Sequence, residues 1–269
     1  MEINKVYNES CLDTMARMPD GFIDLTVTSP PYDNLRTYNG YSFDFEPIAK
    51  ELFRVTKKGG VVVWVVGDAT IKGSETGTSF KQALYFKEIG FNLHDTMIYS
   101  KKNPVPLNHN RYEQQFEYMF VLSKGKPKTF NPLQIFCKTA GKIYNIKRNR
   151  VYDGNALRHN RDETIQTKPT KQAFNIWEYS IGTDKNKKNG HPAIFPEQLA
   201  RDHIISWSNK GDLIYDPFMG SGTTAKMAIL EERNFIGSEI SEEYCKIIEE
   251  RINTGYRELE DIKSQFTLF

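Results

Sequence analysis

Two short motifs hold the residues of this chain that are best suited to chemistry on a ligand. The first is Thr28-Ser29-Pro30-Pro31-Tyr32, which directly follows an apolar, β-rich run. Two prolines restrict the backbone and remove two N–H donors. The Pro30 carbonyl and the Ser29 hydroxyl can therefore accept hydrogen bonds from an amino group, while Tyr32 offers a flat face for an aromatic ring. The alternative interpretation is a strand that ends in a Pro-Pro turn with an exposed tyrosine.

The second motif is rich in glycine and reads Asp216-Pro217-Phe218-Met219-Gly220-Ser221-Gly222-Thr223-Thr224. Glycine allows a tight turn and a close approach of the backbone to a ligand, and the helix expected after it presents free N–H groups. Glu239 ends the next expected strand, where an acidic side chain can bind both hydroxyls of a ribose. No lysine follows the last glycine, unlike in a phosphate-binding loop. A tight turn without a ligand is the alternative.

Alternating strand and helix patterns surround both motifs. Short β-branched runs over 22–28 and 60–66 are expected as buried strands of a parallel sheet, and a helix over 47–55 lies between them, ended by the turn residues 57–60. Further helix and strand segments are expected over 79–90, 91–99 and 116–123. The pattern returns with a helix over 196–207, a strand over 212–216, a helix over 223–232, a strand over 234–239 and a helix over 241–251 capped by Ser241. This order predicts a doubly wound α/β fold.

Charge is unevenly distributed along the chain. Residues 97–190 contain 18 Lys or Arg and 7 Asp or Glu, a balance of +11, whereas the whole chain carries only +2. A basic segment in an otherwise acidic protein indicates binding of a polyanion. A solvated loop region without a partner is the alternative.

The cysteines are Cys11, Cys137 and Cys245, which are odd in number, far apart and without a CxxC pair. They predict neither a disulfide framework nor a zinc site, and we expect no metal. The N-terminal residues lack the apolar stretch of a signal peptide, and no segment has the roughly 20 apolar residues of a membrane span. These features predict a soluble, cytoplasmic protein.

Together, the two motifs resemble the catalytic tetrapeptide and the cofactor loop of the beta-class amino DNA methyltransferases. Segments 13–32, 111–124 and 191–196 resemble further stretches of that family. The resemblance implies a Rossmann-like fold with a doubly wound mixed sheet that binds S-adenosylmethionine. It assigns 1–125 and 190–269 to the catalytic domain and 126–189 to a small inserted target-recognition region.

The resemblance also implies roles for individual residues. The catalytic residues would be Ser29, Pro30, Pro31 and Tyr32. The cofactor would be bound by Asp216, Pro217, Phe218, Gly220, Ser221, Gly222, Thr223, Glu239, Ser10 and Pro192. Ser10 marks a departure, because the family often has Asp at the matching position before a Cys-Leu step. DNA phosphates would be held by Lys101, Lys102, Arg111, Lys147, Arg148 and Arg150.

Family members with Ser before Pro-Pro-Tyr tend to methylate N4 of cytosine, and those with Asp there tend to methylate N6 of adenine. Ser29 therefore favours cytosine N4, with adenine N6 as the alternative. The target base would be flipped out of the duplex, because its amine cannot be reached inside the helix. Methylation at cytosine C5 is disfavoured, since no cysteine follows a proline.

Other functions and partners stay open from the sequence. The same chemistry could act on RNA or on a glutamine side chain, although glutamine methylation usually goes with Asn in place of Ser29. A catalytically silent DNA-binding module is a further alternative. Duplex DNA is the expected partner, and a homodimer, a cognate restriction endonuclease and nucleoid association are open. The final residues Gln265-Phe266-Thr267-Leu268-Phe269 resemble a peptide that docks on the sliding clamp, with a frayed tail as the alternative.

Overall fold

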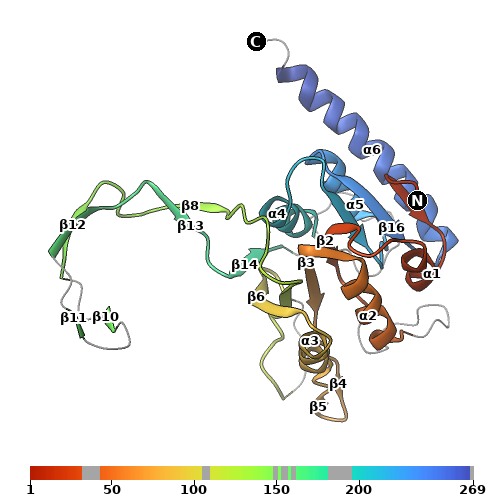
Figure 1. Ribbon diagram of the computed structural model, residues 1–269, viewed down its shortest axis with the longest axis horizontal. Coiled ribbons are helices and arrows are strands. Elements are labelled where there is room, and N and C mark those ends of the chain that lie inside the picture. Colours follow the sequence, from red (N-terminus) through yellow and green to blue (C-terminus); the bar gives the residue numbers. More distant parts are fainter. Residues whose placement is uncertain are drawn as a thin grey trace. The chain divides into compact units, whose positions relative to one another are not determined.

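The computed structural model describes residues 1–31, 43–104, 110–147, 151–152, 157–158, 162–180 and 196–266 (Figure 1). The chain divides into two compact units. The larger unit comprises Met1–Asn131 and Asn175–Phe269, and the smaller unit comprises Pro132–Phe174. Both motifs that the sequence singled out belong to the larger unit.

An eight-stranded mixed sheet forms the centre of the larger unit. Its strand order is β1-β16-β15-β2-β3-β7-β6-β14. The strands are β1 (Lys5–Tyr7), β16 (Asn234–Ser238), β15 (Leu213–Asp216), β2 (Ile23–Thr28), β3 (Thr56–Val66), β7 (Phe116–Ser123), β6 (Asn92–Lys101) and β14 (Ile176–Tyr179). Neighbouring strands pair in parallel except at β7, which runs antiparallel to both β3 and β6. The expected α/β fold with a mixed sheet is confirmed.

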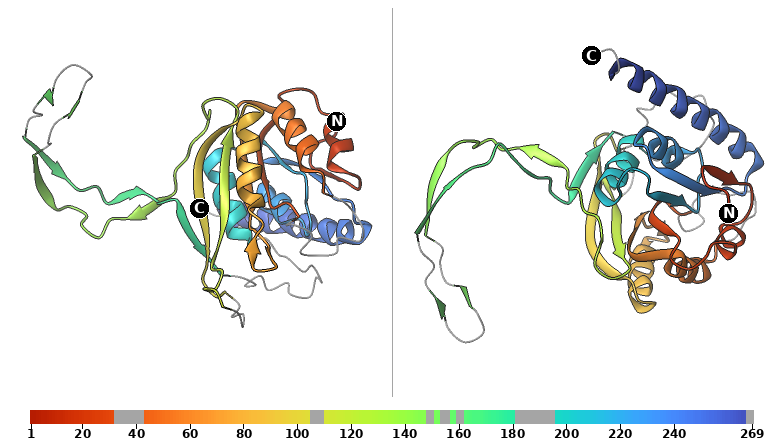
Figure 2. Two further views of the ribbon diagram at one scale, coloured as in Figure 1. Left: turned by 90° about the horizontal axis from the view of Figure 1, so that it is seen from below. Right: turned by 45° about the horizontal axis from the view of Figure 1, so that its top comes forward.

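Helices cover both faces of this sheet (Figure 2). One face carries α1 (Cys11–Ala16), α2 (Phe45–Val55) and α3 (Thr78–Glu88), and the other carries α4 (Glu197–Trp207), α5 (Thr223–Leu230) and α6 (Glu242–Phe266). Strand β3 supplies both cores, because side chains alternate across a strand. Val61, Val63 and Val65 face α4 to α6, whereas Val62, Trp64 and Val66 face α1 to α3.

The chain leaves the centre of the sheet in opposite directions. From β2 it runs through α2 to β3 on one side, and from β15 through α5 to β16 on the other. Because β2 and β15 are adjacent and parallel, their carboxyl ends form the switch point at which open α/β sheets bind ligands. Both motifs directly follow these two strand ends.

Several element boundaries differ from those expected. Helix α2 ends at Val55 as expected, but residues 57–60 lie within strand β3, which begins at Thr56, and interrupt its pairing with β2 as a bulge in which Gly59 adopts φ +82°. The partner of Ile23 is Thr56 and that of Leu25 is Val61, so the additional residues lie on β3. Helix α6 continues to Phe266, well past residue 251, and Ser241 caps it as expected, with Tyr244 N–H donating to its hydroxyl at 3.3 Å.

The smaller unit consists of successive antiparallel strand pairs. Strand β8 (Gln134–Phe136) pairs with β13 (Thr170–Gln172), β9 (Ile143–Lys147) with β12 (Asp162–Gln166), and β10 (Val151–Tyr152) with β11 (Leu157–Arg158). None of its described side chains belongs to the buried hydrophobic core. Strand β14 lies within the range 126–189 but joins the main sheet, because Trp177 and Tyr179 pack on its core.

A small hairpin of β4 (Thr70–Ile71) and β5 (Ser74–Glu75) lies between β3 and α3 in the chain. None of the described helices is long and apolar enough to cross a membrane.

Candidate functional site

The two motifs meet at the carboxyl ends of β2 and β15. The Thr28 hydroxyl donates a 2.6 Å hydrogen bond to Oδ1 of Asp216, between residues that lie 188 positions apart in the chain. Ser29 and the buried Pro30 follow Thr28 directly. This bond therefore holds the Ser-Pro-Pro segment against the first residue of the glycine-rich loop.

Asp216 is a buried carboxyl group at this junction, with 5% of its surface exposed. Burial raises the pKa of Asp216 to about 6, although hydrogen bonds from Thr28, Thr224 and the backbone amide of Phe218 oppose the rise. The Phe218 N–H donates to Oδ1 at 3.0 Å. A cationic group bound nearby would favour the ionised carboxylate.

The glycine-rich loop requires glycine at Gly222. This residue adopts φ +83° and precedes the first turn of α5, where no side chain caps the helix. A Cβ atom at Gly222 would lie 3.2 to 3.3 Å from atoms of Ile248 on α6. The loop thus turns tightly with α6 close behind it, and the amides that begin α5 follow the loop directly.

Glu239 follows β16 and connects two loops. Its Oε2 accepts from the Gly220 N–H at 2.8 Å, and its Oε1 accepts from the Ser241 N–H at 2.9 Å. The side chain is 8% exposed, and burial raises the pKa of its carboxyl group. A carboxylate has about four acceptor positions, so positions remain for two ribose hydroxyls.

Ser10 follows strand β1, whose pairing with β16 brings Tyr7 opposite Ser238. Its hydroxyl accepts from the Leu12 N–H at 3.2 Å and caps α1. Asn8 from the same loop donates to the Glu239 carbonyl at 2.8 Å. Buried carboxylates and a glycine-lined loop along one strand edge fit a cationic ligand that carries a ribose.

Arg251 was not predicted from the sequence as a site residue, and it stabilises the glycine-rich loop through hydrogen bonds from α6. Its guanidinium donates to the Ser221 carbonyl, the Ser221 hydroxyl and the Thr223 hydroxyl at 2.8 to 3.1 Å. It also pairs with Glu197 on α4 at 2.6 Å, and Glu197 lies 3.3 Å from Lys226 on α5. Arg251 follows the buried Ile248 by one helical turn, so a charged residue on the apolar face was the available signal.

Replacing Arg251 with Gln is expected to weaken binding of the cofactor that the resemblance implies, S-adenosylmethionine, by about tenfold. Each lost hydrogen bond to a charged group contributes roughly 1.5 to 3 kcal/mol, and this loss is shared between folding and binding. Calorimetric titration measures the Kd, and thermal unfolding measures the stability. The control is Arg257→Gln on the same helix, because Arg257 bonds only to Asn253 and Thr254 of its own helix among described contacts. Equal cofactor affinity in both variants would contradict a role in shaping the loop.

Some predicted DNA contacts are engaged within the protein. Lys101 pairs with Glu117 at 2.7 Å, and Lys102 lies 4.0 Å from Glu178. Arg111 bonds to the Gly73 carbonyl and lies 3.9 Å from Glu75. The pairs of Lys102 and Arg111 are exposed and contribute little stability, so these two residues can exchange their partners for phosphates. The Lys101–Glu117 pair is largely enclosed, with side chains 19% and 16% exposed. These DNA-binding roles stay predictions.

Other predicted site residues lie outside the described parts of the chain. They are Tyr32, Arg148, Arg150 and Pro192, together with the side chain of Lys147 and the last three residues of the clamp-like peptide, Thr267, Leu268 and Phe269.

Two cysteines of the larger unit are poor nucleophiles. Burial raises the pKa of Cys11 to about 12 and that of Cys245 to about 11, so both are neutral thiols near pH 7. This agrees with a reaction at an exocyclic amine rather than at a ring carbon. Within the described ranges, no group of three or more His, Cys, Asp or Glu could hold a metal ion.

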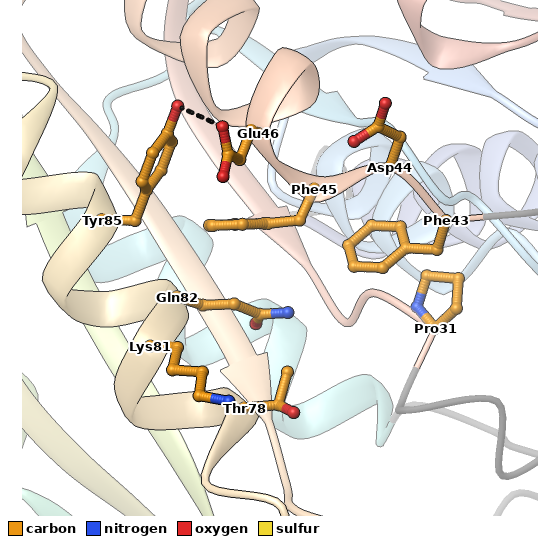
Figure 3. Close-up of a pocket in the computed structure, with 9 residues that line it drawn as sticks. All are labelled: Pro31, Phe43, Asp44, Phe45, Glu46, Thr78, Lys81, Gln82 and Tyr85. Atoms are coloured by element: carbon orange, nitrogen blue, oxygen red, sulfur yellow. Dashed lines mark hydrogen bonds between the residues drawn. The ribbon is translucent and has the colours of Figure 1, made fainter.

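A cavity of about 490 Å³ adjoins the Ser-Pro-Pro segment (Figure 3). Pro31 lines it together with Phe43, which precedes α2, and with residues of α2 and α3, among them Phe45, Thr78 and Gln82. The cavity is large enough for a nucleobase and lies next to the predicted catalytic residues.

Comparison with known proteins places this geometry in context. A family model described as DNA methylase, for N6 and N4 methyltransferases, matches residues 23–250. The orphan methyltransferase M.BamHII of Bacillus amyloliquefaciens is 59% identical over 242 residues, which cover 87% of this chain and 89% of the relative.

Solved structures share the fold. The cytosine-N4-specific PvuII DNA methyltransferase aligns with a TM-score of 0.69 at 21% identity, over 95% of this chain and 92% of that chain. The M1.HpyAVI complex with S-adenosylmethionine aligns with a TM-score of 0.63 at 22% identity, over 93% of this chain and 98% of that chain.

Proposed function

Because this chain belongs to the DNA methylase family of N6 and N4 methyltransferases, we propose that it methylates the exocyclic N4 of cytosine in duplex DNA. The family uses S-adenosylmethionine as the methyl donor. The observation that carries the proposal is the hydrogen bond between Thr28 and Asp216, since it joins the predicted catalytic segment to the predicted cofactor loop.

The cofactor supplies a methyl group on a sulfonium cation, which is strongly electrophilic. The amine of a base is a weak nucleophile, because its lone pair is delocalised into the ring. The Ser29 hydroxyl and the Pro30 carbonyl accept hydrogen bonds from the two amine hydrogens and turn the lone pair toward the methyl group. Alignment of this kind can lower the barrier by several kcal/mol, up to about 7 to 11 in well-oriented cases. The proton then leaves to solvent or through Ser29.

Ser29 supports cytosine over adenine through the family tendency described above. The PvuII enzyme, which shares the fold, is named as specific for cytosine N4. The M.BamHII relative is named as an orphan methyltransferase, which supports action without a dedicated endonuclease partner.

The smaller unit and its flanking segments supply the DNA-reading function in this proposal. Residues 126–189 fall within the basic stretch of the chain, and lysines or arginines there would hold phosphates while neighbouring polar side chains read base edges. The target base leaves the stack to reach the Ser-Pro-Pro segment. We propose that the protein acts on the DNA of a prokaryotic or phage-infected cell, which the bacterial source of the M.BamHII relative supports.

Mass spectrometry of nucleosides tests the proposal. Duplex DNA of mixed sequence is incubated with S-adenosylmethionine and with wild type, Ser29→Ala or Asp216→Ala. We expect N4-methylcytosine with wild type alone. N6-methyladenine would keep the chemistry and overturn the assignment of the base. No methylated base, despite measurable cofactor binding, would overturn duplex DNA as the substrate.

A further inference from the structure

The cavity beside Pro31 contains one buried amide whose orientation is determined by a neighbour. Gln82 on α3 is 3% exposed and lines the cavity. Its Oε1 accepts a 2.8 Å hydrogen bond from Nε1 of Trp64, a fully buried residue of β3. Because an indole N–H can only donate, the oxygen of the amide must face Trp64 and the NH₂ group must face away from it.

The NH₂ group of Gln82 is directed into the cavity. In the view of Figure 3, its nitrogen points toward the side where Phe43 and Pro31 lie. Among the described residues, no hydrogen bond from this nitrogen is present, whereas the oxygen is engaged. An amide N–H that faces a cavity can donate to a ligand that brings an acceptor into it.

The Watson–Crick edge of a flipped base supplies such an acceptor. In cytosine, the ring nitrogen N3 lies next to the N4 amine, and in adenine N1 lies next to the N6 amine. Both ring nitrogens accept a hydrogen bond. The corresponding ring positions of thymine and guanine carry N–H groups, which would face the Gln82 donor without a partner. A single donor at this place therefore separates bases with a methylatable amine from those with a carbonyl group.

We propose that Gln82 donates a hydrogen bond to the ring nitrogen beside the target amine and thereby selects and orients the flipped base. The residue contacts the substrate, with Trp64 as the positioning residue that prevents its amide from turning over. The proposal rests on the proposed function in one respect, namely that a base enters the cavity next to Ser29 and Pro30. It applies to cytosine N3 and to adenine N1 alike.

The variant Gln82→Glu tests this role with a minimal change of shape. It keeps an acceptor for Trp64, and in its ionised form it replaces the donor by a second acceptor, so activity is measured at pH 8. We expect kcat/KM for duplex DNA to fall by about 10- to 100-fold, the range for loss of one specific base contact. The Kd for S-adenosylmethionine is expected to stay within about twofold. The control is Leu84→Glu, which adds the same charge at a 64% exposed position of the same helix.

A substrate analogue separates contact with the base from an effect on folding. DNA with 3-deazacytosine at the target position has C–H in place of N3, so wild type should lose activity on it by a similar factor. Gln82→Glu should then show little further loss, because the contact is already absent. If the loss of activity caused by Gln82→Glu and the loss caused by 3-deazacytosine multiply, Gln82 does not contact N3. A Kd for S-adenosylmethionine that rises as much as activity falls would also overturn the contact.

The neutral variant Gln82→Met repeats the comparison without an added charge. Failure of the proposed function is detected separately, by identifying the methylated nucleoside that the wild-type protein forms in duplex DNA. If that nucleoside is N6-methyladenine, the same comparison with 1-deazaadenine decides the role of Gln82. If DNA is not methylated and a base does not enter the cavity, both the function and this inference fail.

Discussion

Replacing Ser29 with Ala is expected to lower kcat for DNA methylation by about 100- to 1,000-fold, the range found when one positioned hydrogen-bonding group that acts in the transition state is removed. Of the two proposed acceptors for the hydrogens of the target amine, the Pro30 carbonyl alone would remain. The amine could then rotate back into conjugation with the ring, and its lone pair would point away from the methyl group.

Single-turnover methylation with saturating cofactor measures this effect, and calorimetric titration measures cofactor binding. The Kd for S-adenosylmethionine should change by less than about threefold, because the Thr28–Asp216 bond and the glycine-rich loop are intact in the variant. Ser264→Ala serves as the control, since Ser264 bonds only to the Asp261 carbonyl on the exposed end of α6 among described contacts. An unchanged kcat in Ser29→Ala would remove Ser29 from the mechanism.

Substitution of Asp216 by Asn should weaken cofactor binding by about 10- to 100-fold at pH 8, the equivalent of one hydrogen-bonded charge. Asn preserves the shape and can still accept from Thr28, but it carries no charge to attract a sulfonium cation. The loss should therefore be greatest where wild-type Asp216 is ionised.

The pH dependence follows from the pKa of about 6 for Asp216 in the folded protein, against 3.8 for an ordinary Asp. Between these values the folded protein keeps a proton that the unfolded chain has released, so the contribution of this group to stability falls as pH rises from about 4 to about 6. Cofactor binding should change in the opposite direction, because the cation favours the ionised carboxylate. Affinity should decrease as pH is lowered through about 6.

Titrations from pH 5 to pH 8 compare wild type with Asp216→Asn. Wild-type affinity should fall more steeply toward low pH, and any slope left in the variant is assigned to Glu239, whose pKa is also raised by burial. Asp212→Asn is the control, because Asp212 lies at the opposite end of β15 and accepts from the Asn209 N–H. Parallel pH profiles for wild type and Asp216→Asn would show that the Asp216 charge does not act on the cofactor.

The sequence by itself determined those structural features that depend only on residues close together in the chain. The β-branched runs ending at Thr28 and Val66 are strands because their side chains can be buried on both faces of a sheet that helices cover on each side. The cap at Ser241 and the turn at Gly222 follow from local backbone chemistry. For the same reason, both chemical motifs were visible as continuous runs of residues.

Only the tertiary structure decided which of these residues meet. The spacing of 188 residues between Thr28 and Asp216 carries no signal, and their contact exists because β2 and β15 pair at the switch point. Gln82 reads as an ordinary residue on a helix until the Trp64 indole turns its amide toward the cavity. Arg251 stands out in the sequence only as a charge on the apolar face of a helix, and its contacts with Ser221 and Thr223 exist because α6 packs behind the loop. Side chains acquire such roles through packing between residues far apart in the chain. Patterns in the sequence reflect only the local periodicity of side chains along a helix or a strand.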